Sequence, residues 1–589
     1  MACWFSTEPD GRSPKWDNRN DPKVPPTVTS TDVQDLFIDW KTAMIEKIEI
    51  KGFKILRNFS WEPKEGVNII VGANSTGKST LLDAIELVSK GTIRNVRAMS
   101  AISPDWFNID MVREFYDSLS SGFECALPEI SIATTFSGNR VLSNLQGCNG
   151  PNRGREDKPG LWFRIFVPEE LQPQFLAEIR TALKTNPQET LPVEYYECIW
   201  TTFKGERIVR RPNHVSCSRV DASPEPFSKA VGSFTRSLIE DQLDNEQTRS
   251  IASRIRSART QIDTGILSEI KVPIKGMSGT LGLQLDKSPR SDWRNSVVLE
   301  RENLPLSAFG SAEQVMAKAA ISLAGSDESP ILLFEEPECH LSHTSLTKLL
   351  SVIDDSIGNN QQAFITTHSP FVLNRLGLDK TFLIAAADTL STIADLSQET
   401  VLYFKRLSGY DTLRIVLADR AVLVEGPADE MVFNWAFRKL RGSLPSEQGI
   451  DVIEYGIRHK RALELAASVD RAQFAALRDN DGKSEDAWKE AASSFCKTGE
   501  RAIFVGHDNE GTTLEPQMVF CNHDNIQLLS NIVGYEGQDE RGLEEFMLTH
   551  KTSWSLKLLE HNRATSERLN VPRYISEAID FIDPKGITE

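Results

Sequence analysis

The segment from Gly72 to Thr80 carries residues whose types and order suit the binding of a nucleotide's phosphates. It reads Gly-Ala-Asn-Ser-Thr-Gly-Lys-Ser-Thr and follows three apolar residues. Its glycines let the backbone curl so that N–H groups point at phosphate oxygens, Lys78 adds positive charge, and the Ser79 hydroxyl can ligate Mg²⁺. The predicted phosphate-binding residues are Gly72, Asn74, Ser75, Thr76, Gly77, Lys78, Ser79 and Thr80.

Two later segments end in polar residues that can act on the same nucleotide. The apolar run 331–334 is followed by Glu335 and Glu336, and the run 362–366 leads to His368. One carboxylate can hold Mg²⁺ while the next orients or deprotonates a water. The histidine can hydrogen-bond a γ-phosphate, and Ser311, at the start of an apolar helix, offers a second phosphate-reading surface.

The last third of the chain carries a separate set of acids. Glu425 follows the apolar run 421–424, Asp429 opens a helix, and Asp479 and Asp481 follow the apolar run 474–477. Acids at the ends of neighbouring parallel strands converge and repel one another, and a divalent metal removes that conflict. Ligands that are all oxygen favour Mg²⁺ or Mn²⁺ over zinc.

Buried strands and short helices must position these residues. The fully apolar runs before Gly72, Glu335 and His368 are typical of central parallel strands, whose carboxyl ends form ligand sites. Helices are predicted for residues 78–89 and 429–440, each with its first turn facing a site. Alternation predicts a strand over 45–50, and further strands are expected near 129–136, 161–167 and 195–203.

The first group of motifs resembles the split ATPase head of the ABC-type group that includes the RecF and SMC proteins. The resemblance rests on residues 48–85, 310–314, 334–340 and 366–370. It implies a dimer of heads that sandwiches ATP, with Ser311 of one subunit reaching the γ-phosphate held by the other. It further implies that Glu335 supports Mg²⁺, Glu336 is the catalytic glutamate and His368 is the switch histidine.

The second group resembles the Toprim domain of topoisomerases, primases and some nucleases. The resemblance makes Glu425 an acid/base or metal-binding glutamate, Asp429 a second ligand, and Asp479 and Asp481 the metal-binding pair. The segment 541–548 is similar to one that follows the core in relatives, which nominates Glu544 as a further metal ligand. Residues 458–461, Arg-His-Lys-Arg, have two interpretations: they contact a nucleic-acid backbone, or they form a solvated loop and the start of a helix.

Composition sets the class of protein. The chain has 589 residues, 66 basic and 83 acidic, for a formal charge of −17, with 40% hydrophobic residues. This balance argues against a generally basic nucleic-acid coat but leaves local patches open. Its eight scattered cysteines form no C-x-x-C pair, and we identify neither a secretory signal nor a membrane span. We therefore expect a cytoplasmic protein that does not enter membranes.

The expected fold is α/β: an ABC-type P-loop ATPase head with a helical and β insertion, followed by a Toprim domain built on a parallel sheet. Seven regions are predicted: an N-terminal extension 1–43, the N-terminal half of the head 44–115, an insertion with a helical dimerisation region 116–290, the C-terminal half of the head 291–395, a linker 396–418, the Toprim core 419–535 and a helical segment 536–589. A helix is predicted over 228–262, with its arginines either solvated or touching phosphates.

An ABC-type head followed by a Toprim domain resembles the overcoming lysogenization defect (OLD) family of nucleases. The resemblance implies an ATP-binding and ATP-hydrolysing, Mg²⁺-dependent endonuclease, with DNA as the favoured substrate, assembled as a homodimer or higher homo-oligomer and acting in bacterial anti-phage defence. One alternative is a Toprim nuclease directed at RNA such as tRNA. A second is an ATP-driven sensor or clamp that holds a partner protein or a nucleic-acid particle.

Overall fold

A computed structural model describes residues 43–584 of the chain. The longer gaps in this description are 153–156, 186–189, 210–214, 222–234, 239–242, 274–279, 286–292, 325–329, 407–411 and 562–565, and shorter gaps span one to three residues. The chain divides into two compact units, Met1–Lys41 and Thr42–Glu589, and only the second is described here. The predicted extension, 1–43, therefore lies almost wholly outside the described residues.

A mostly parallel sheet carries the phosphate-binding segment. Its strand order is β10 (Cys217–Asp221), β15 (Ile331–Glu335), β16 (Gln362–Thr366), β3 (Val67–Gly72), β17 (Thr381–Ala386) and β18 (Thr389–Thr392). The first five strands run parallel, and β18 pairs antiparallel with β17. Every residue of β3 and β16 is buried, as expected for central parallel strands, and this includes the polar side chains of Asn68 and Gln362.

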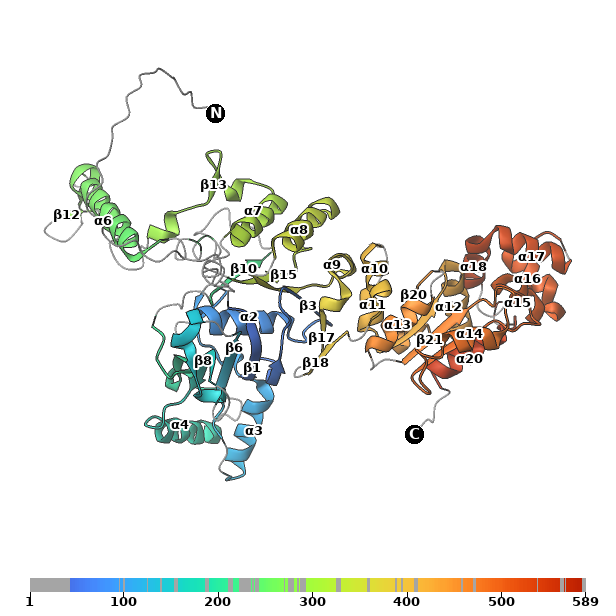
Figure 1. Ribbon diagram of the computed structural model, residues 1–589, viewed down its shortest axis with the longest axis horizontal. Coiled ribbons are helices and arrows are strands. Elements are labelled where there is room, and N and C mark those ends of the chain that lie inside the picture. Colours follow the sequence, from blue (N-terminus) through green and yellow to red (C-terminus); the bar gives the residue numbers. More distant parts are fainter. Residues whose placement is uncertain are drawn as a thin grey trace, which may run out of the picture. The chain divides into compact units, whose positions relative to one another are not determined.

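An antiparallel sheet covers the opposite side of the helix that follows β3. It contains β1 (Ile45–Phe53), β2 (Leu56–Trp61), β6 (Ile130–Phe136), β8 (Lys158–Phe166) and β9 (Glu197–Thr202), with the short β7 (Gln146–Gly147) at one end. The helix α2 (Lys78–Lys90) lies between the two sheets, since Leu81 and Ile85 share one core with Ile48 of β1 and Ile70 of β3. Figure 1 shows α2 beside β6 and β1.

This sheet changes the view of the predicted insertion. Strand β6 pairs with β1, β8 pairs with β6, and β9 pairs with β8, so these three strands of the region 116–290 extend the sheet that begins in the N-terminal half. Two helices, α3 (Ile109–Ser120) and α4 (Gln172–Thr185), accompany it. The predicted helix 228–262 is confirmed over α6 (Asn245–Ile262), whose Asp244 side chain caps it in a capping box, and most of its part before Asp244 lies outside the described residues. The dimerisation role of this region stays a prediction.

Helices α7 (Ser311–Ala324), α8 (His343–Ser356) and α9 (Pro370–Leu376) cover the other face of the parallel sheet. Their residues Val315, Leu349 and Val372 share a core with Val71 and Phe334. The predicted linker, 396–418, contains two helices, α10 (Gln398–Arg406) and α11 (Thr412–Leu417). It is thus a structured connection, held in part by the buried hydrogen bond from Thr412 to Asn374.

A second parallel sheet organises the C-terminal region, in the order β20 (Asp451–Glu454), β19 (Arg420–Val424), β21 (Gln473–Arg478) and β22 (Arg501–Val505). Val422 and Val424 pack with α12 (Pro427–Arg441) and α20 (Arg573–Ile582), whereas Leu423 packs with α13 (His459–Val469). The sheet is therefore covered on both faces, as expected for parallel strands. The remaining described helices are α14 (Glu485–Ala492), α15 (Leu514–Cys521), α16 (Ile526–Val533), α17 (Glu540–Thr549) and α18 (Lys551–Glu560).

Within the described residues, no helix is both long enough and apolar enough to cross a membrane.

Candidate functional site

The phosphate-binding segment forms a tight loop between β3 and α2. Gly77 has a φ of +109°, a conformation that favours glycine. At Gly72 a Cβ atom would lie 2.6 Å from the Thr76 Oγ1 and 2.7 Å from the Ile384 carbonyl oxygen, so only glycine fits without movement. The loop thus has the shape that the sequence predicted, and the first turn of α2 begins at Lys78.

Lys78 folds back over its own loop. Its Nζ donates to the carbonyl oxygens of Gly72, at 2.9 Å, and Ala73, at 2.8 Å. Burial lowers the pKa of Lys78, while the nearby carboxylates of Glu336 and Glu338 act in the opposite direction. The lysine and these acids, which come from different strands, therefore share one site.

The acids after β15 and the histidine after β16 meet at this edge. Glu336 has a φ of +45°, and its Oε1 lies 3.7 Å from Nε2 of His368. Glu338 accepts hydrogen bonds from the Thr367 hydroxyl, at 2.8 Å, and from the His368 amide, at 2.7 Å. Glu338 therefore fixes the loop that carries His368, and Glu336 faces the same space as the loop of Lys78.

A buried arginine that the sequence did not single out binds Glu335. Arg219 of β10 donates to the Glu335 carboxylate at 2.5 Å, and to Asp83 and Glu86 of α2 at 2.6 and 3.1 Å. Lys54 also binds Asp83, at 2.6 Å. Burial alone would raise the pKa of Asp83, but Arg219 and Lys54 outweigh it and lower that pKa. The Glu335 carboxylate is thus held by a network that reaches α2.

Ser311 is the first residue of α7, as predicted. The helix packs on β10, where the Ser322 and Ser218 hydroxyls lie 2.9 Å apart. The side-chain amide of Gln314 donates to the Phe309 carbonyl oxygen and closes the turn before the helix. The contact that Ser311 would make to a nucleotide on another subunit stays a prediction.

A second group of acids meets in the C-terminal region, and we call it the acidic site: Glu425, Asp429, Asp479, Asp481 and Glu515. Glu425 follows β19, Asp429 lies in the first turn of α12, and Asp479 and Asp481 follow β21. Because β19 and β21 are parallel neighbours, their carboxyl ends lie side by side. The four acids predicted from the sequence are thus brought to one edge.

Burial and neighbouring negative charges raise the pKa of three acids of this site. Burial and then the negative charges of Glu425 and Glu515 raise the pKa of Asp429 to about 7. Burial and then the charges of Asp429, Glu425 and Glu515 raise the pKa of Asp479 to about 8. Burial also raises the pKa of Glu425. Such mutual repulsion in a group of carboxylates is what a bound cation would relieve.

Glu515, in the first turn of α15, is the member that sequence reasoning missed. It is 1% exposed, accepts a hydrogen bond from Thr513 and lies 3.9 Å from the Lys551 ammonium of α18. A buried glutamate next to three acids needs compensation by a positive charge. The signal that could have found it is an acid in the first turn of a helix that follows a glycine-containing loop.

The residues of the acidic site have the right chemical type to bind a divalent cation, but their side chains are not arranged as a closed set of ligands. The donor set is made of carboxylate oxygens, which Mg²⁺ and Mn²⁺ prefer. The Asp479 Oδ1 is buried and has no hydrogen-bond partner among the described residues. However, no three His, Cys, Asp or Glu side chains within the described part of the chain come together closely enough to hold a metal. Instead, Arg478 binds both Glu425 and Asp481.

The sequence also pointed to Glu544 and to the basic segment 458–461, but none of the contacts described above involves them. The charges that act on Glu544 of α17 are those of Glu540 and Arg541 on its own helix, so its role as a ligand stays a prediction. Arg458 lies outside the described residues. Arg461 binds Glu399, at 3.0 Å, and the Thr400 hydroxyl, which supports its reading as part of a packed helix start.

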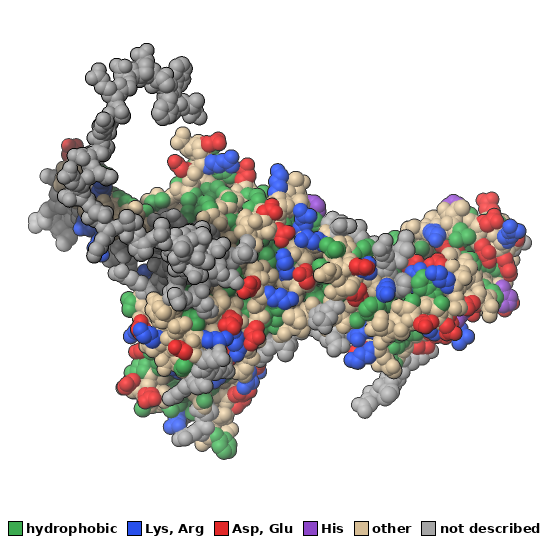
Figure 2. All heavy atoms as spheres, viewed as in Figure 1, with side chains coloured by type: hydrophobic (Ala, Val, Ile, Leu, Met, Phe, Trp, Pro, Cys, Tyr) green, Lys and Arg blue, Asp and Glu red, His purple; other side chains and the backbone are tan. Residues whose placement is uncertain are grey.

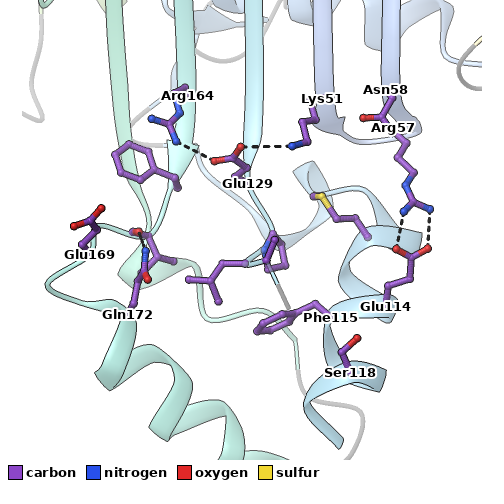
Figure 3. A pocket seen from close by; sticks show the side chains of 16 residues that line it. Lys51, Arg57, Asn58, Glu114, Phe115, Ser118, Glu129, Arg164, Glu169 and Gln172 are labelled. Carbon is purple, nitrogen blue, oxygen red and sulfur yellow. Dashed lines mark hydrogen bonds and ion pairs between the residues drawn. The ribbon is translucent and has the colours of Figure 1, made fainter. Parts of the chain in front are cut away.

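A cavity of about 710 Å³ lies beside the antiparallel sheet and α3 (Figure 3). Arg57 makes two hydrogen bonds to Glu114, at 2.6 and 2.7 Å, and Arg164 and Lys51 both face Glu129. Phe115 and the neighbouring apolar side chains form its floor. The basic residues Arg57, Arg164 and Lys51 are thus paired with acids of the same cavity.

Three family models match separate parts of the chain. Residues 44–127 match the "AAA ATPase domain", and residues 208–374 match the "AAA domain, putative AbiEii toxin, Type IV TA system". Residues 416–481 match the "Overcoming lysogenization defect protein-like, TOPRIM domain". These spans contain the phosphate-binding loop, the acids after β15 with His368, and four members of the acidic site.

Individual proteins are similar to parts of the chain. The chain is 34% identical over 70 residues to a DNA replication and repair protein RecF of Thioalkalivibrio sulfidiphilus, which is 12% of this chain and 19% of that protein. It is 23% identical to an ATP/GTP phosphatase of Helicobacter pylori over 55% of this chain and 85% of that protein. A solved RecF–ATP structure aligns with 60% of this chain and 99% of its own, at 13% identity and a TM-score of 0.32.

Proposed function

Since this chain joins an AAA-type ATPase head to a Toprim domain of the overcoming lysogenization defect protein-like kind, we propose that it is a nuclease whose cutting of nucleic acid is controlled by ATP. The phosphodiester is cleaved at the acidic site, and ATP is bound and hydrolysed at the loop of Lys78. Mg²⁺ is the proposed metal at both sites, and Mn²⁺ is its substitute in vitro.

The observation that carries this proposal is the convergence of five carboxylates from β19, α12, β21 and α15. Two of them, Asp429 and Asp479, have raised pKa values because they are buried and, in addition, lie near the other negative charges. We propose that Glu425, Asp429, Asp479 and Asp481 hold the metal, and that Glu515 completes the site. A divalent metal there would supply positive charge for the attacking and leaving oxygens of the phosphodiester.

The ATP site is proposed to act as a pair of heads. Lys78 and Ser79 bind the phosphates and their metal, Glu335 supports that metal, and Glu336 activates water with His368 beside it. Ser311 of a second subunit completes the site, which requires at least a homodimer. Mass measurement of Glu336→Gln with ATP tests this arrangement, and a strict monomer at micromolar protein would contradict it.

DNA is the proposed first target, and RNA such as tRNA is the second to be tested. The acids would contact phosphates rather than bases, so they set no preference between the two. On the face shown in Figure 2, acidic and basic side chains are interspersed over the coloured part of the surface. With a formal charge of −17, binding must depend on local basic groups and should weaken steeply with salt.

The direct test is cleavage by purified protein. Duplex DNA, single-stranded DNA and tRNA are incubated with Mg²⁺ or Mn²⁺, each without nucleotide, with ATP and with a non-hydrolysable analogue. We expect the wild-type protein to cut nucleic acid. Asp479→Asn and Glu425→Gln should abolish this cleavage, and Glu515→Gln should lower its rate. In Lys78→Ala, cleavage should no longer respond to ATP. Glu500→Gln, which changes a half-exposed acid of the same region, is the matched control. Cutting that survives Asp479→Asn would overturn the proposal.

One observation favours a second function. Arg478 already bridges Glu425 and Asp481, and no three potential ligands meet in the described residues. The chain could then act as an ATP-driven sensor or clamp that holds a protein or a nucleic-acid particle. Purification of wild type and Lys78→Ala from the native host separates the two readings: a partner that is retained only by wild type, together with no cleavage, supports the clamp.

We further propose a role in bacterial defence against phage. The matched families include the overcoming lysogenization defect protein-like group and a domain named for a toxin–antitoxin system. Plaque counts on cells that express wild type, Lys78→Ala or Asp479→Asn test this role. Equal plaque counts for all three across a broad phage panel would contradict it.

A further inference from the structure

Arg478, the last residue of β21, places a positive charge between two acids of the acidic site. Its Nη1 donates to Glu425 Oε1 at 2.9 Å, and its Nη2 donates to Asp481 Oδ2 at 2.7 Å. The arginine side chain is only 4% exposed. A guanidinium thus occupies carboxylate oxygens from two different strand ends, which are oxygens that a shared metal would need.

The position of this guanidinium is fixed from its other side. Its carbon lies 3.8 Å from the centre of the Trp488 ring, a cation–π contact. The Trp488 indole donates to the Asn480 carbonyl oxygen at 2.8 Å. Asn480 in turn donates to the carbonyl oxygens of Gly506 and Gly511. Arg478 is therefore held by the strand, the ring and two carboxylates together.

The charges around Arg478 explain why it lies there. The acidic site has five carboxylates, and the described cations that act on it are Arg478 and Lys551. Ion pairs between arginine and carboxylate are strong, charge-assisted contacts, and a buried acid without one is costly. In the absence of metal, Arg478 supplies this compensation.

We propose that Arg478 is the internal counter-cation of the metal-free acidic site and that it competes with the divalent metal for Glu425 and Asp481. Metal binding then requires that at least one of these two ion pairs opens. Arg478 thereby sets the metal concentration at which the site fills. This inference rests on the proposed function, because it takes the acidic site to be a metal site.

The test measures metal binding rather than cleavage. Mn²⁺ is titrated calorimetrically, without nucleotide, into wild type, Arg478→Gln and Arg441→Gln. Arg441 is the matched control, since it is a buried arginine of the same region that binds Asp580 at 2.8 Å and Asp583 at 3.0 Å. Thermal unfolding is recorded for each protein in EDTA and in Mn²⁺.

We expect Arg478→Gln to bind Mn²⁺ about tenfold more tightly or better, because one nearby unit charge has at least this effect in a partly buried site. In EDTA, Arg478→Gln should also unfold at a lower temperature than wild type. Adding Mn²⁺ should raise its unfolding temperature by more than it raises that of wild type. Arg441→Gln should lose stability with an unchanged Mn²⁺ affinity. Arg478→Lys, which keeps the charge but cannot bridge both acids, should lie between wild type and Arg478→Gln.

Two outcomes would overturn the inference, and they are distinguishable. If wild type binds Mn²⁺ and Arg478→Gln binds it equally or more weakly, Arg478 supports the ligands instead of competing, while the proposed function stands. If wild type, Arg478→Gln and Arg478→Lys all fail to bind Mn²⁺ at millimolar concentration, the metal site and the proposed function fail together. If Arg478→Gln does not fold, the Mn²⁺ affinity of Arg478→Lys decides: an affinity higher than that of wild type supports the inference, and an equal or lower one overturns it.

Discussion

Arg219 donates to Glu335 across 2.5 Å and so joins the edge strand β10 to the carboxylate at the end of β15. The same guanidinium binds Asp83 and Glu86 of α2, whose side chains are 1% exposed. One buried arginine thus connects the helix after the phosphate-binding loop, the first glutamate after the apolar run of β15 and the strand on which α7 packs. A shift of β10 would therefore move the guanidinium that holds the Glu335 carboxylate.

We predict that Arg219→Met lowers the free energy of unfolding by about 3–5 kcal/mol, the usual cost of removing one partner from a buried ion pair. Urea unfolding of the purified protein measures it. Arg164→Met is the matched control, because its ion pair with Glu129 is about one-third exposed, and such a pair is worth about 1 kcal/mol or less. Equal losses in the two variants would contradict the role of Arg219.

We predict that Glu336→Gln lowers the rate of ATP hydrolysis by about 100-fold or more, the usual contribution of a general base, while ATP still binds. The Glu336 carboxylate lies 3.7 Å from His368 and near Lys78. Phosphate release and binding of a fluorescent ATP analogue provide the two measurements. Lys78→Ala should lose binding as well, and a Glu336→Gln protein that hydrolyses ATP normally would exclude this glutamate.

The third prediction concerns pH. The pKa of Asp479 is about 8 in the folded protein, whereas an unfolded chain would have the ordinary value of about 4. A raised pKa means that the folded state holds its proton more tightly, so the stability cost of ionising Asp479 is absent below pH 4, grows as pH rises and is complete above pH 8. In EDTA, Asp479→Asn should therefore gain stability relative to wild type between pH 5 and pH 8.5.

Thermal unfolding at several pH values, in EDTA, follows this difference. Mn²⁺ affinity of wild type should rise over the same range, because Asp429 and Asp479 must lose protons before they bind metal. The charges that face these acids are those of Glu425, Glu515 and Lys551. A stability difference between Asp479→Asn and wild type that stays constant with pH would show that Asp479 is already ionised at pH 5.

The sequence predicted which candidate residues would meet where they follow apolar strands closely. Glu336, His368, Glu425 and Asp479 are of this kind, because parallel strands bring their carboxyl ends to one edge and the apolar runs mark where each strand stops. The order of the strands was not predictable from the runs themselves. β3, for example, lies between β16 and β17, which are far later in the chain.

The residues that the sequence missed act through burial, which has no local pattern. Arg219 is a single arginine in a short strand, and only the packing of β10 against β15 shows that it meets three acids. Glu515 lies in a helix without a motif. The sequence also did not show that β6, β8 and β9 belong to the same sheet as β1, because these strands are joined by pairings between residues far apart in the chain.

The ring of Trp488 contacts two cations, Arg478 at 3.8 Å and Lys483 at 4.5 Å from its centre. Because indole emission responds to nearby charge, this tryptophan is a natural optical probe of the acidic site. A change in its fluorescence on adding Mn²⁺, absent in Trp488→Phe, would let the departure of the arginine be timed in a stopped-flow instrument, without any substrate or label.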